Sequence, residues 1–257
     1  MLNMEALQVV VVIAAGLAIT TLLILLSLLF MGWIQNNREK RQERFYVKWE
    51  PLLAEASLGE QFPLLPSLRR RDYISFLLLW NRFQQNLRAE SRWGLVQLAN
   101  NLGMDKVVAR MTGSRDETDK ALAALTLGNL KDYSRWYLLQ NMAERESGMS
   151  AQIAAGALAK IDPLRAAPIL ISLFVERHEW PQTRVAAILD EMGSETVSKP
   201  LVEAIRKAEK ADIPRLLRFI PFIEPRAAVL LVRNLLSTHH DSEVIAACLT
   251  AVRYLED

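Results

Sequence analysis

One uninterrupted apolar stretch, residues 9–34, constrains this chain more than any other feature. It holds 26 residues and no ionisable side chain. A segment that crosses a bilayer has to be helical and apolar over about 20 residues, because lipid offers no hydrogen bonds to peptide groups. As a helix the stretch would be about 39 Å long, enough to cross about 30 Å of hydrocarbon with some tilt. We therefore predict a transmembrane anchor at residues 1–35, in contact with the lipid bilayer through residues 9–34.

Side chains inside the stretch fit a membrane helix. The hydroxyls of Thr20, Thr21 and Ser27 can donate hydrogen bonds back to carbonyls of their own helix. Small residues at close spacing also allow a second membrane helix to approach. These candidate packing residues are Ala14, Gly16 and Ala18.

A cleaved signal peptide is the alternative interpretation of the stretch. A signal peptide has a positively charged start, a shorter apolar core and a small-residue cleavage site. Here the first eight residues include Glu5 and no Lys or Arg, the apolar run is longer, and no A-x-A pattern follows it. These three departures favour a retained anchor.

The flanks of the stretch predict its orientation. Four basic residues lie within 35–44, after the stretch, whereas residues 1–8, before the stretch, contain none. Because Lys and Arg are enriched on the cytoplasmic side, we expect the N-terminus outside and the rest of the chain in the cytoplasm. We predict a juxtamembrane helix and linker over 36–67, with the helix ending near Pro51, followed by a helical domain over 68–257. The single cysteine, Cys248, agrees with a reducing compartment.

Beyond Ala89 the sequence repeats with a period near 31 residues. Related apolar triplets begin at Leu122, Ile153, Val185 and Ile245, and Leu216 and Leu217 fill the remaining position. Predicted turns follow at Gly128 and Asn129, Asp162 and Pro163, Gly193 and Ser194, and Glu224 and Pro225. After each turn we predict a second helix, over 134–145, 164–176, 195–208 and 226–236, in addition to a helix over 73–87. No alternating strand pattern or hairpin turn occurs, so the predicted fold class is all-α.

The segment 151–177 shows how one repeat would fold. Its first helix carries an apolar stripe at Ile153, Ala157, Leu158 and Ile161. Asp162 is placed to cap the second helix, and Pro163 takes the first helical position, which needs no amide donor. One such helix pair cannot bury its apolar surface alone, so neighbouring pairs are expected to stack into an α-solenoid of helical hairpins.

The period, the two helices per period and the Asp-Pro turn resemble HEAT repeats and their short bacterial relatives. The resemblance covers about 89–257, and it implies a HEAT-like scaffold or docking surface. Together with the anchor, it is similar to bacterial inner-membrane accessory subunits of glycosyltransferase systems that make envelope polysaccharides. It therefore implies a non-catalytic scaffold or regulatory subunit that docks a protein partner, with localisation in the bacterial inner membrane. An enzyme with a cryptic site and a nucleotide- or lipid-sensing module are the alternatives.

Few residues offer catalytic or metal-binding chemistry. The candidate soft ligands lack the spacing of a zinc site, and no P-loop, G-x-S-x-G or G-x-G-x-x-G motif occurs. We therefore predict no catalytic residues, no cofactor and no metal. The net charge of +2 also disfavours a nucleic-acid partner, which requires clustered uncompensated positive charge. The candidate metal ligands that lack the spacing of a zinc site are His178, His239, His240 and Cys248.

Two sets of residues are the candidate contacts for a protein partner. Exposed positions of the second helices form the first set: Arg165, Glu176, Arg206 and Arg233. The second set lies in 242–255, which resembles the first helix of an incomplete last repeat, and consists of Ile245 and Leu249. We expect this helix to be covered by a partner, to be continued by further chain, or to act as its own cap.

Overall fold

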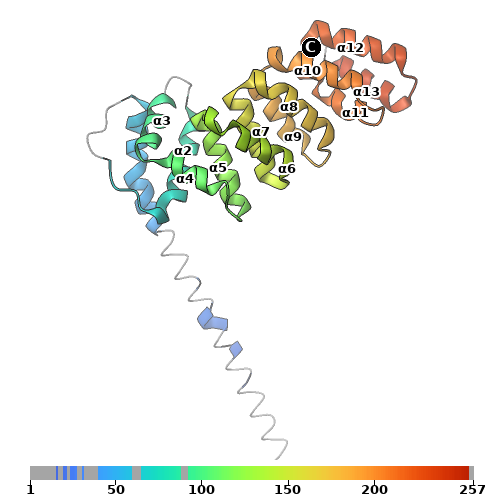
Figure 1. The fold of residues 1–257 in the computed structure, drawn as a ribbon. Helices are drawn as coiled ribbons and strands as arrows, with labels where there is room; N and C mark the ends of the chain where they lie inside the picture. Colours follow the sequence, from blue (N-terminus) through green and yellow to red (C-terminus); the bar gives the residue numbers. More distant parts are fainter. Residues whose placement is uncertain are drawn as a thin grey trace, which may run out of the picture. The chain divides into compact units, whose positions relative to one another are not determined.

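The computed structural model describes residues 40–59, 65–87 and 92–254, together with 16, 20, 21, 24–27 and 31. These residues form helices and connecting turns, with no strand among them, which confirms the predicted all-α class (Figure 1). The chain divides into two compact units, Met1–Leu79 and Trp80–Asp257. Helix α2 (Tyr73–Asn86) contains the boundary, and its bounds agree with the predicted helix over 73–87.

Most of the predicted anchor, including Ala14 and Ala18, lies outside the described residues. In the part of the chain that the structure describes, no helix is both long and apolar enough to cross a membrane. The described positions of 9–34 are helical. Thr20 Oγ1 donates a hydrogen bond to the carbonyl of Gly16 at 2.7 Å, and Ser27 Oγ donates to that of Ile24 at 3.0 Å. The hydroxyls of Thr20 and Ser27 therefore bond back to their own helix, as predicted.

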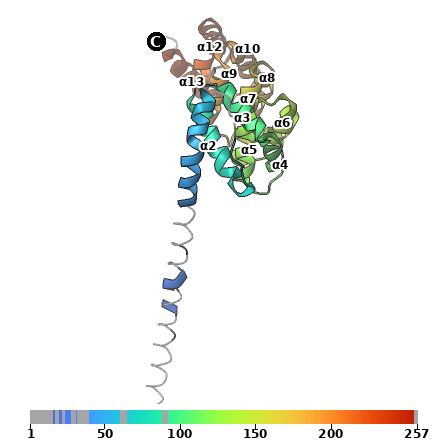
Figure 2. The same cartoon turned by 90° about the vertical axis from the view of Figure 1, so that its left-hand side faces the viewer.

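The first unit contains a helix over residues 40–57, which passes through Pro51 (Figure 2). The prediction that this helix ends near Pro51 is wrong. Trp49 and Leu53 are buried on the two sides of the proline, and the ring of Trp49 meets Phe76 edge-on at 5.2 Å. Burial of large side chains stabilises the helix here by more than the missing hydrogen bond of the proline destabilises it.

The second unit is built of helix pairs joined by short turns. In chain order its helices are α3 (Arg92–Asn101), α4 (Met104–Met111), α5 (Glu117–Leu130), α6 (Trp136–Arg145), α7 (Gly148–Ile161), α8 (Pro163–Glu176), α9 (Gln182–Met192), α10 (Ser194–Lys207), α11 (Ile213–Leu216), α12 (Pro225–Thr238) and α13 (Ser242–Arg253). Helices α5, α7 and α9 pack side by side, and so do α8, α10 and α12. This arrangement in two rows is compatible with an α-solenoid. The predicted second helices agree with α6, α8, α10 and α12 to within two residues at each end.

The turn between α7 and α8 forms as predicted. The side chain of Asp162 accepts a hydrogen bond from the amide of Arg165 at 3.1 Å, and Pro163 is the first residue of α8. Of the predicted stripe, Ala157, Leu158 and Ile161 are buried. The N-terminal cap and the apolar stripe thus act together to place the two helices against each other.

The predicted turn at Gly128 and Asn129 is wrong, because both residues lie inside α5. The chain turns at Lys131, whose φ of 51° ends the helix in the left-handed conformation. Gly128 instead allows α5 and α7 to approach closely: a Cβ atom there would lie 2.7 Å from the Cα atom of Ala157. The glycine that predicted a turn is a packing residue.

The predicted helix around Leu216 and Leu217 is irregular. A single turn, α11, is followed directly by the 3-10 helix η4 (Leu217–Phe222). Pro221 prevents a continuous α-helix here, since proline cannot donate the backbone hydrogen bond that the helix needs, whereas Pro214 lies in the first turn of α11, where no donor is required.

Two arginines contact the C-terminal ends of helices that belong to earlier helix pairs. Arg177, directly after α8, donates through Nη1 to the carbonyl of Glu146 at 3.0 Å and through Nη2 to that of Ala143 at 3.4 Å. Arg215 in α11 donates to the carbonyls of Phe174 at 2.8 Å and Val175 at 2.7 Å. Each guanidinium therefore satisfies carbonyls at the C-terminus of α6 or α8 that have no partner within the helix.

Candidate functional site

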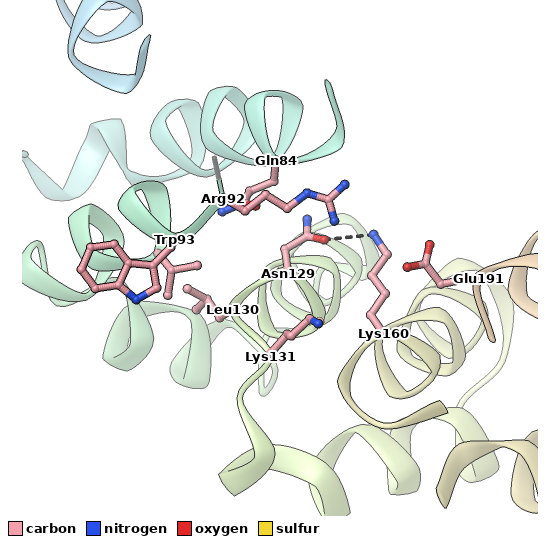
Figure 3. Close-up of a pocket in the computed structure, with 10 residues that line it drawn as sticks. Gln84, Arg92, Trp93, Asn129, Leu130, Lys131, Lys160 and Glu191 are labelled. Atoms are coloured by element: carbon pink, nitrogen blue, oxygen red, sulfur yellow. Dashed lines mark hydrogen bonds between the residues drawn. The ribbon is translucent and has the colours of Figure 1, made fainter. Parts of the chain in front are cut away.

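A pocket of about 340 Å³ opens where α2, α3, α5, α7 and α9 meet in the second unit (Figure 3). Its volume lies within the range of small-molecule binding sites. We call it the basic pocket. It is lined by Gln84, Arg92, Trp93, Val96, Gly128, Asn129, Leu130, Lys131, Lys160 and Glu191.

Positive charge dominates this pocket. Arg92, Lys131 and Lys160 come from three different segments of the chain, and Glu191 is the one carboxylate among the lining residues. In Figure 3, Lys160 and Glu191 lie on one side of the pocket and Trp93 on the other. Neither Arg92 nor Lys131 forms an ion pair with any residue that the structure describes. The pocket therefore offers uncompensated charge to an anion.

A chain of hydrogen bonds fixes one wall of the pocket. Lys160 Nζ donates to Asn129 Oδ1 at 3.0 Å, and Asn129 Nδ2 donates to Asn81 Oδ1 at 2.7 Å. Asn81 Nδ2 donates in turn to Thr126 Oγ1 at 2.8 Å. These bonds join α2, α5 and α7 through side chains that are buried or half-buried. A connected polar network of this kind holds its members in one geometry.

Burial lowers the pKa of the Lys160 ammonium, and the nearby charge of Arg92 acts in the same direction, whereas Glu191 opposes the shift. Loss of water from around a cation disfavours its charged form. An anion bound beside Lys160 would remove this disadvantage, because it would supply the missing opposite charge.

Gln84 is the polar group of the pocket whose hydrogen bonds are unsatisfied. Its side chain is 2% exposed, and neither Oε1 nor Nε2 has a partner among the described residues. Its side chain projects from α2 and lies beside that of Arg92 (Figure 3). An unpaired buried amide costs about 1–3 kcal/mol, so its presence at a pocket wall indicates a role other than stabilising the fold.

Two further features mark this pocket. Lys131 is the one non-glycine residue with a positive φ among the described residues, a conformation that costs about 1 kcal/mol or more and is often found at functional sites. The indole of Trp93 is 68% exposed although it lines the pocket. An exposed aromatic face beside positive charge can stack on a planar ligand.

The residues predicted to contact a partner do not form this pocket. Glu176, Arg206 and Arg233 are exposed on three different second helices. Arg165 is exposed as well, but its guanidinium lies over the rings of Trp136 at 4.4 Å and Tyr137 at 5.4 Å. These positions therefore stay candidates for contacts spread along the second helices, with Arg165 already held by two aromatic rings.

The two candidates on α13 differ from each other. Leu249 is 60% exposed, whereas Ile245 is half-buried. Large apolar side chains are also exposed on other helices of the second unit. They include Tyr137 on α6, Leu164 on α8, and Val229 and Leu230 on α12.

The basic pocket was not predicted from the sequence. Its residues are separated by up to 107 positions, from Gln84 to Glu191, and no local motif links them. Of the pocket residues, Lys160 is the one that the sequence marks most clearly as unusual, because it is the only charged residue in the apolar helix α7. A lysine in such a helix is either exposed or held by a specific partner, and here Asn129 is that partner.

Within the ranges that the structure describes, no group of three or more His, Cys, Asp and Glu residues could hold a metal ion. Comparison with known proteins does not assign the chain to a family: no protein-family model matches it, and no curated protein matches it either.

Proposed function

We propose that this chain is a membrane-anchored, non-catalytic adaptor of the bacterial inner membrane. Residues 9–34 would hold it in the bilayer with the N-terminus outside, and a HEAT-like α-solenoid would present a docking surface in the cytoplasm. The apolar stretch and its basic flank support the topology. The stacked helix pairs support the scaffold role, because such arrays expose long surfaces to partners.

The observation that carries the docking role is the exposure of large apolar side chains on the second helices. Tyr137 and Leu164 are 75% and 76% exposed, and Val229 and Leu230 are 52% and 61% exposed. The packing of the helix pairs leaves more than half of the area of each residue in solvent, although the ring of Tyr137 lies 5.4 Å from the guanidinium of Arg165 on α8. Exposed apolar groups that recur along one set of helices are typical of a surface that another protein covers.

The partner that the HEAT resemblance favours is a membrane glycosyltransferase complex of envelope polysaccharide synthesis. An inner-membrane partner is also consistent with the proposed anchor, which would keep the helical domain beside the bilayer. A second membrane helix packed on Ala14, Gly16 and Ala18 would add to the same interaction.

Photo-crosslinking in the native host tests the docking surface. A photoreactive amino acid placed at Leu230 should give one specific cross-linked membrane protein, identified by mass spectrometry. The matched control is Lys210, which is exposed in the turn after α10 and should give no such product. The adaptor role is refuted by equal products at both positions, or by none at Leu230.

Reporter fusions test the topology independently. Alkaline phosphatase fused after Asp257 should be inactive, because it folds only outside the cytoplasm, and a fluorescent protein at the same position should be bright. Deleting residues 9–34 should release the protein from the membrane fraction. An active phosphatase would overturn the proposed orientation.

A further inference from the structure

The basic pocket has features that docking on the second helices does not require. It lies among α2, α3, α5, α7 and α9, whereas the proposed docking surface belongs to α6, α8 and α12. It combines unpaired cations, an unsatisfied buried amide and an exposed indole. From this combination we propose that the basic pocket binds a nucleoside phosphate, with the phosphate at the cations and the base between Trp93 and Gln84. This inference does not depend on the adaptor role.

The cations identify the phosphate end of the ligand. With three positive groups and the one carboxylate of Glu191, the lining residues carry a net charge of +2, which matches a phosphate dianion. Lys160 uses one of its three ammonium protons on Asn129, so two remain for ligand oxygens. Arg92 donates through Nε to the carbonyl of Leu87 at 3.0 Å, which leaves both terminal nitrogens of its guanidinium for a bidentate contact.

The neutral residues of the basic pocket identify the nucleobase end of the ligand. Gln84 offers one unpaired acceptor and one unpaired donor group in a single plane. A side-chain amide of this kind matches the edge of a nucleobase that presents a neighbouring donor and acceptor, as glutamine does with adenine. The exposed face of Trp93 can stack on the ring of the same base, an interaction available to planar ligands and not to inorganic phosphate.

The fold holds these groups in place before any ligand arrives. Close packing at Gly128 fixes α5 against α7, and the hydrogen-bonded chain from Lys160 through Asn129 to Asn81 joins both to α2. The left-handed backbone at Lys131 turns the chain directly at the pocket edge. A site prepared in this way loses less conformational entropy when it binds.

The test measures binding of AMP, GMP, CMP and UMP to the full-length protein in a non-ionic detergent, by isothermal titration calorimetry. Inorganic phosphate and the four unphosphorylated nucleosides serve as partial ligands. We expect at least one nucleotide to bind about ten-fold or more tightly than either partial ligand, because each lacks one of the two sets of contacts. Lys160→Met should weaken that binding by about ten-fold. Arg206→Met removes one exposed cation outside the pocket and should leave the affinity unchanged.

Gln84→Met separates a ligand contact from a structural role. Methionine has a similar shape and no amide to satisfy, so the ligand-free variant should unfold at the same temperature as the wild type or a higher one. Its affinity for the nucleotide should fall about ten-fold. A variant that is less stable and binds normally would show that Gln84 serves the fold. The proposal is overturned by that result, by phosphate binding as tightly as every nucleotide, or by no binding of any nucleotide.

Discussion

The contact between α5 and α7 and the exposed side of α12 represent opposite uses of a helix surface. At the first, Gly128 and Ala157 let two backbones approach so closely that one added methyl group would collide. At the second, Val229 and Leu230 leave more than half of their area in solvent. Small residues make the first region rigid and suited to holding a pocket. Large uncovered residues make the second region suited to contact with another molecule.

The difference shows why composition alone is a poor guide to role. Both regions are rich in apolar residues, and both belong to helices of similar length, 14 residues each for α5, α7 and α12. The size of the side chains determines whether a helix packs on a neighbour of its own chain or leaves area for a partner.

The largest expected effect is at the contact between α5 and α7. Gly128→Ala should lower the free energy of unfolding by about 3 kcal/mol, because backbone atoms of Ala157 cannot move aside. Gly156→Ala is the matched control: its new Cβ would meet Ile188 at an ordinary 3.9 Å, so it should be neutral or stabilise by up to about 1 kcal/mol. Thermal and urea unfolding followed by circular dichroism give both values. Equal effects at the two glycines would contradict the close contact.

The next effect is expected where α11 contacts the C-terminal end of α8. Arg215→Met should lower the free energy of unfolding by about 2 kcal/mol, because two carbonyls at the end of α8 lose charged donors. Arg206→Met, an exposed position on α10, should change it by less than about 0.5 kcal/mol. Unfolding in urea distinguishes the two variants, and similar midpoints would show that the Arg215 contacts contribute nothing.

A smaller, pH-dependent effect is expected at the start of α7. Glu117 accepts a hydrogen bond from the amide of Ser150 at 2.7 Å, and this backbone bond, with that of the Ser150 side chain, lowers the pKa of the carboxyl group. The stabilisation of the folded protein by the charged Glu117 carboxylate is therefore fully present above the ordinary pKa of glutamate. It is lost as the pH falls through the lowered pKa of Glu117 in the folded protein. E117Q should be less stable than the wild type at neutral pH, by under about 1 kcal/mol because the group is exposed.

The pH series supplies the control for this prediction. The difference between the wild type and E117Q should disappear in acid, where both side chains are neutral. Glu203→Gln, exposed on α10, should show no comparable dependence. A difference that stays constant with pH would mean that the charge of Glu117 is not the cause.

The smallest effect on stability is expected on α12. Leu230→Ser should change the free energy of unfolding by less than about 0.5 kcal/mol, because the side chain is largely in solvent. It should nevertheless reduce the amount of the partner, identified by cross-linking in the otherwise unchanged protein, that co-purifies with this variant. Leu231→Ser, at a fully buried neighbour, checks that unfolding measurements detect a packed leucine in α12. A large loss of stability in Leu230→Ser would show that Leu230 serves the fold instead of a partner.

The helix boundaries were predictable because local chemistry determines them. Asp162 and Pro163 begin α8 as their residue types require, and Ala157, Leu158 and Ile161 of the apolar stripe before them are buried. Predictions failed where tertiary packing overrides local preference. Pro51 continues a helix because Trp49 and Leu53 are buried beside it.

The basic pocket could not be predicted for a related reason. Its charges come from segments that only the stacking of helix pairs brings together. Sequence spacing within one helix does not report which residues of separate pairs will share a cavity. The unsatisfied amide of Gln84 is likewise a property of its surroundings, since glutamine is an ordinary residue in an amphipathic helix.

The arginines after α8 and in α11 have a consequence for how the array would come apart. Arg177 satisfies carbonyls at the end of α6, in the pair before its own, and Arg215 satisfies carbonyls at the end of α8, two pairs before its own. When a later pair unfolds, it therefore withdraws donors from the end of an earlier helix, whereas loss of the earlier pair leaves an arginine that water can solvate. Loss of α11 thus exposes carbonyls at the end of α8, and loss of Arg177 after α8 exposes those at the end of α6, so that unfolding is transmitted in a preferred direction, toward α6. A load applied to α12 or α13 would loosen the chain sequentially, beginning at the end that is pulled.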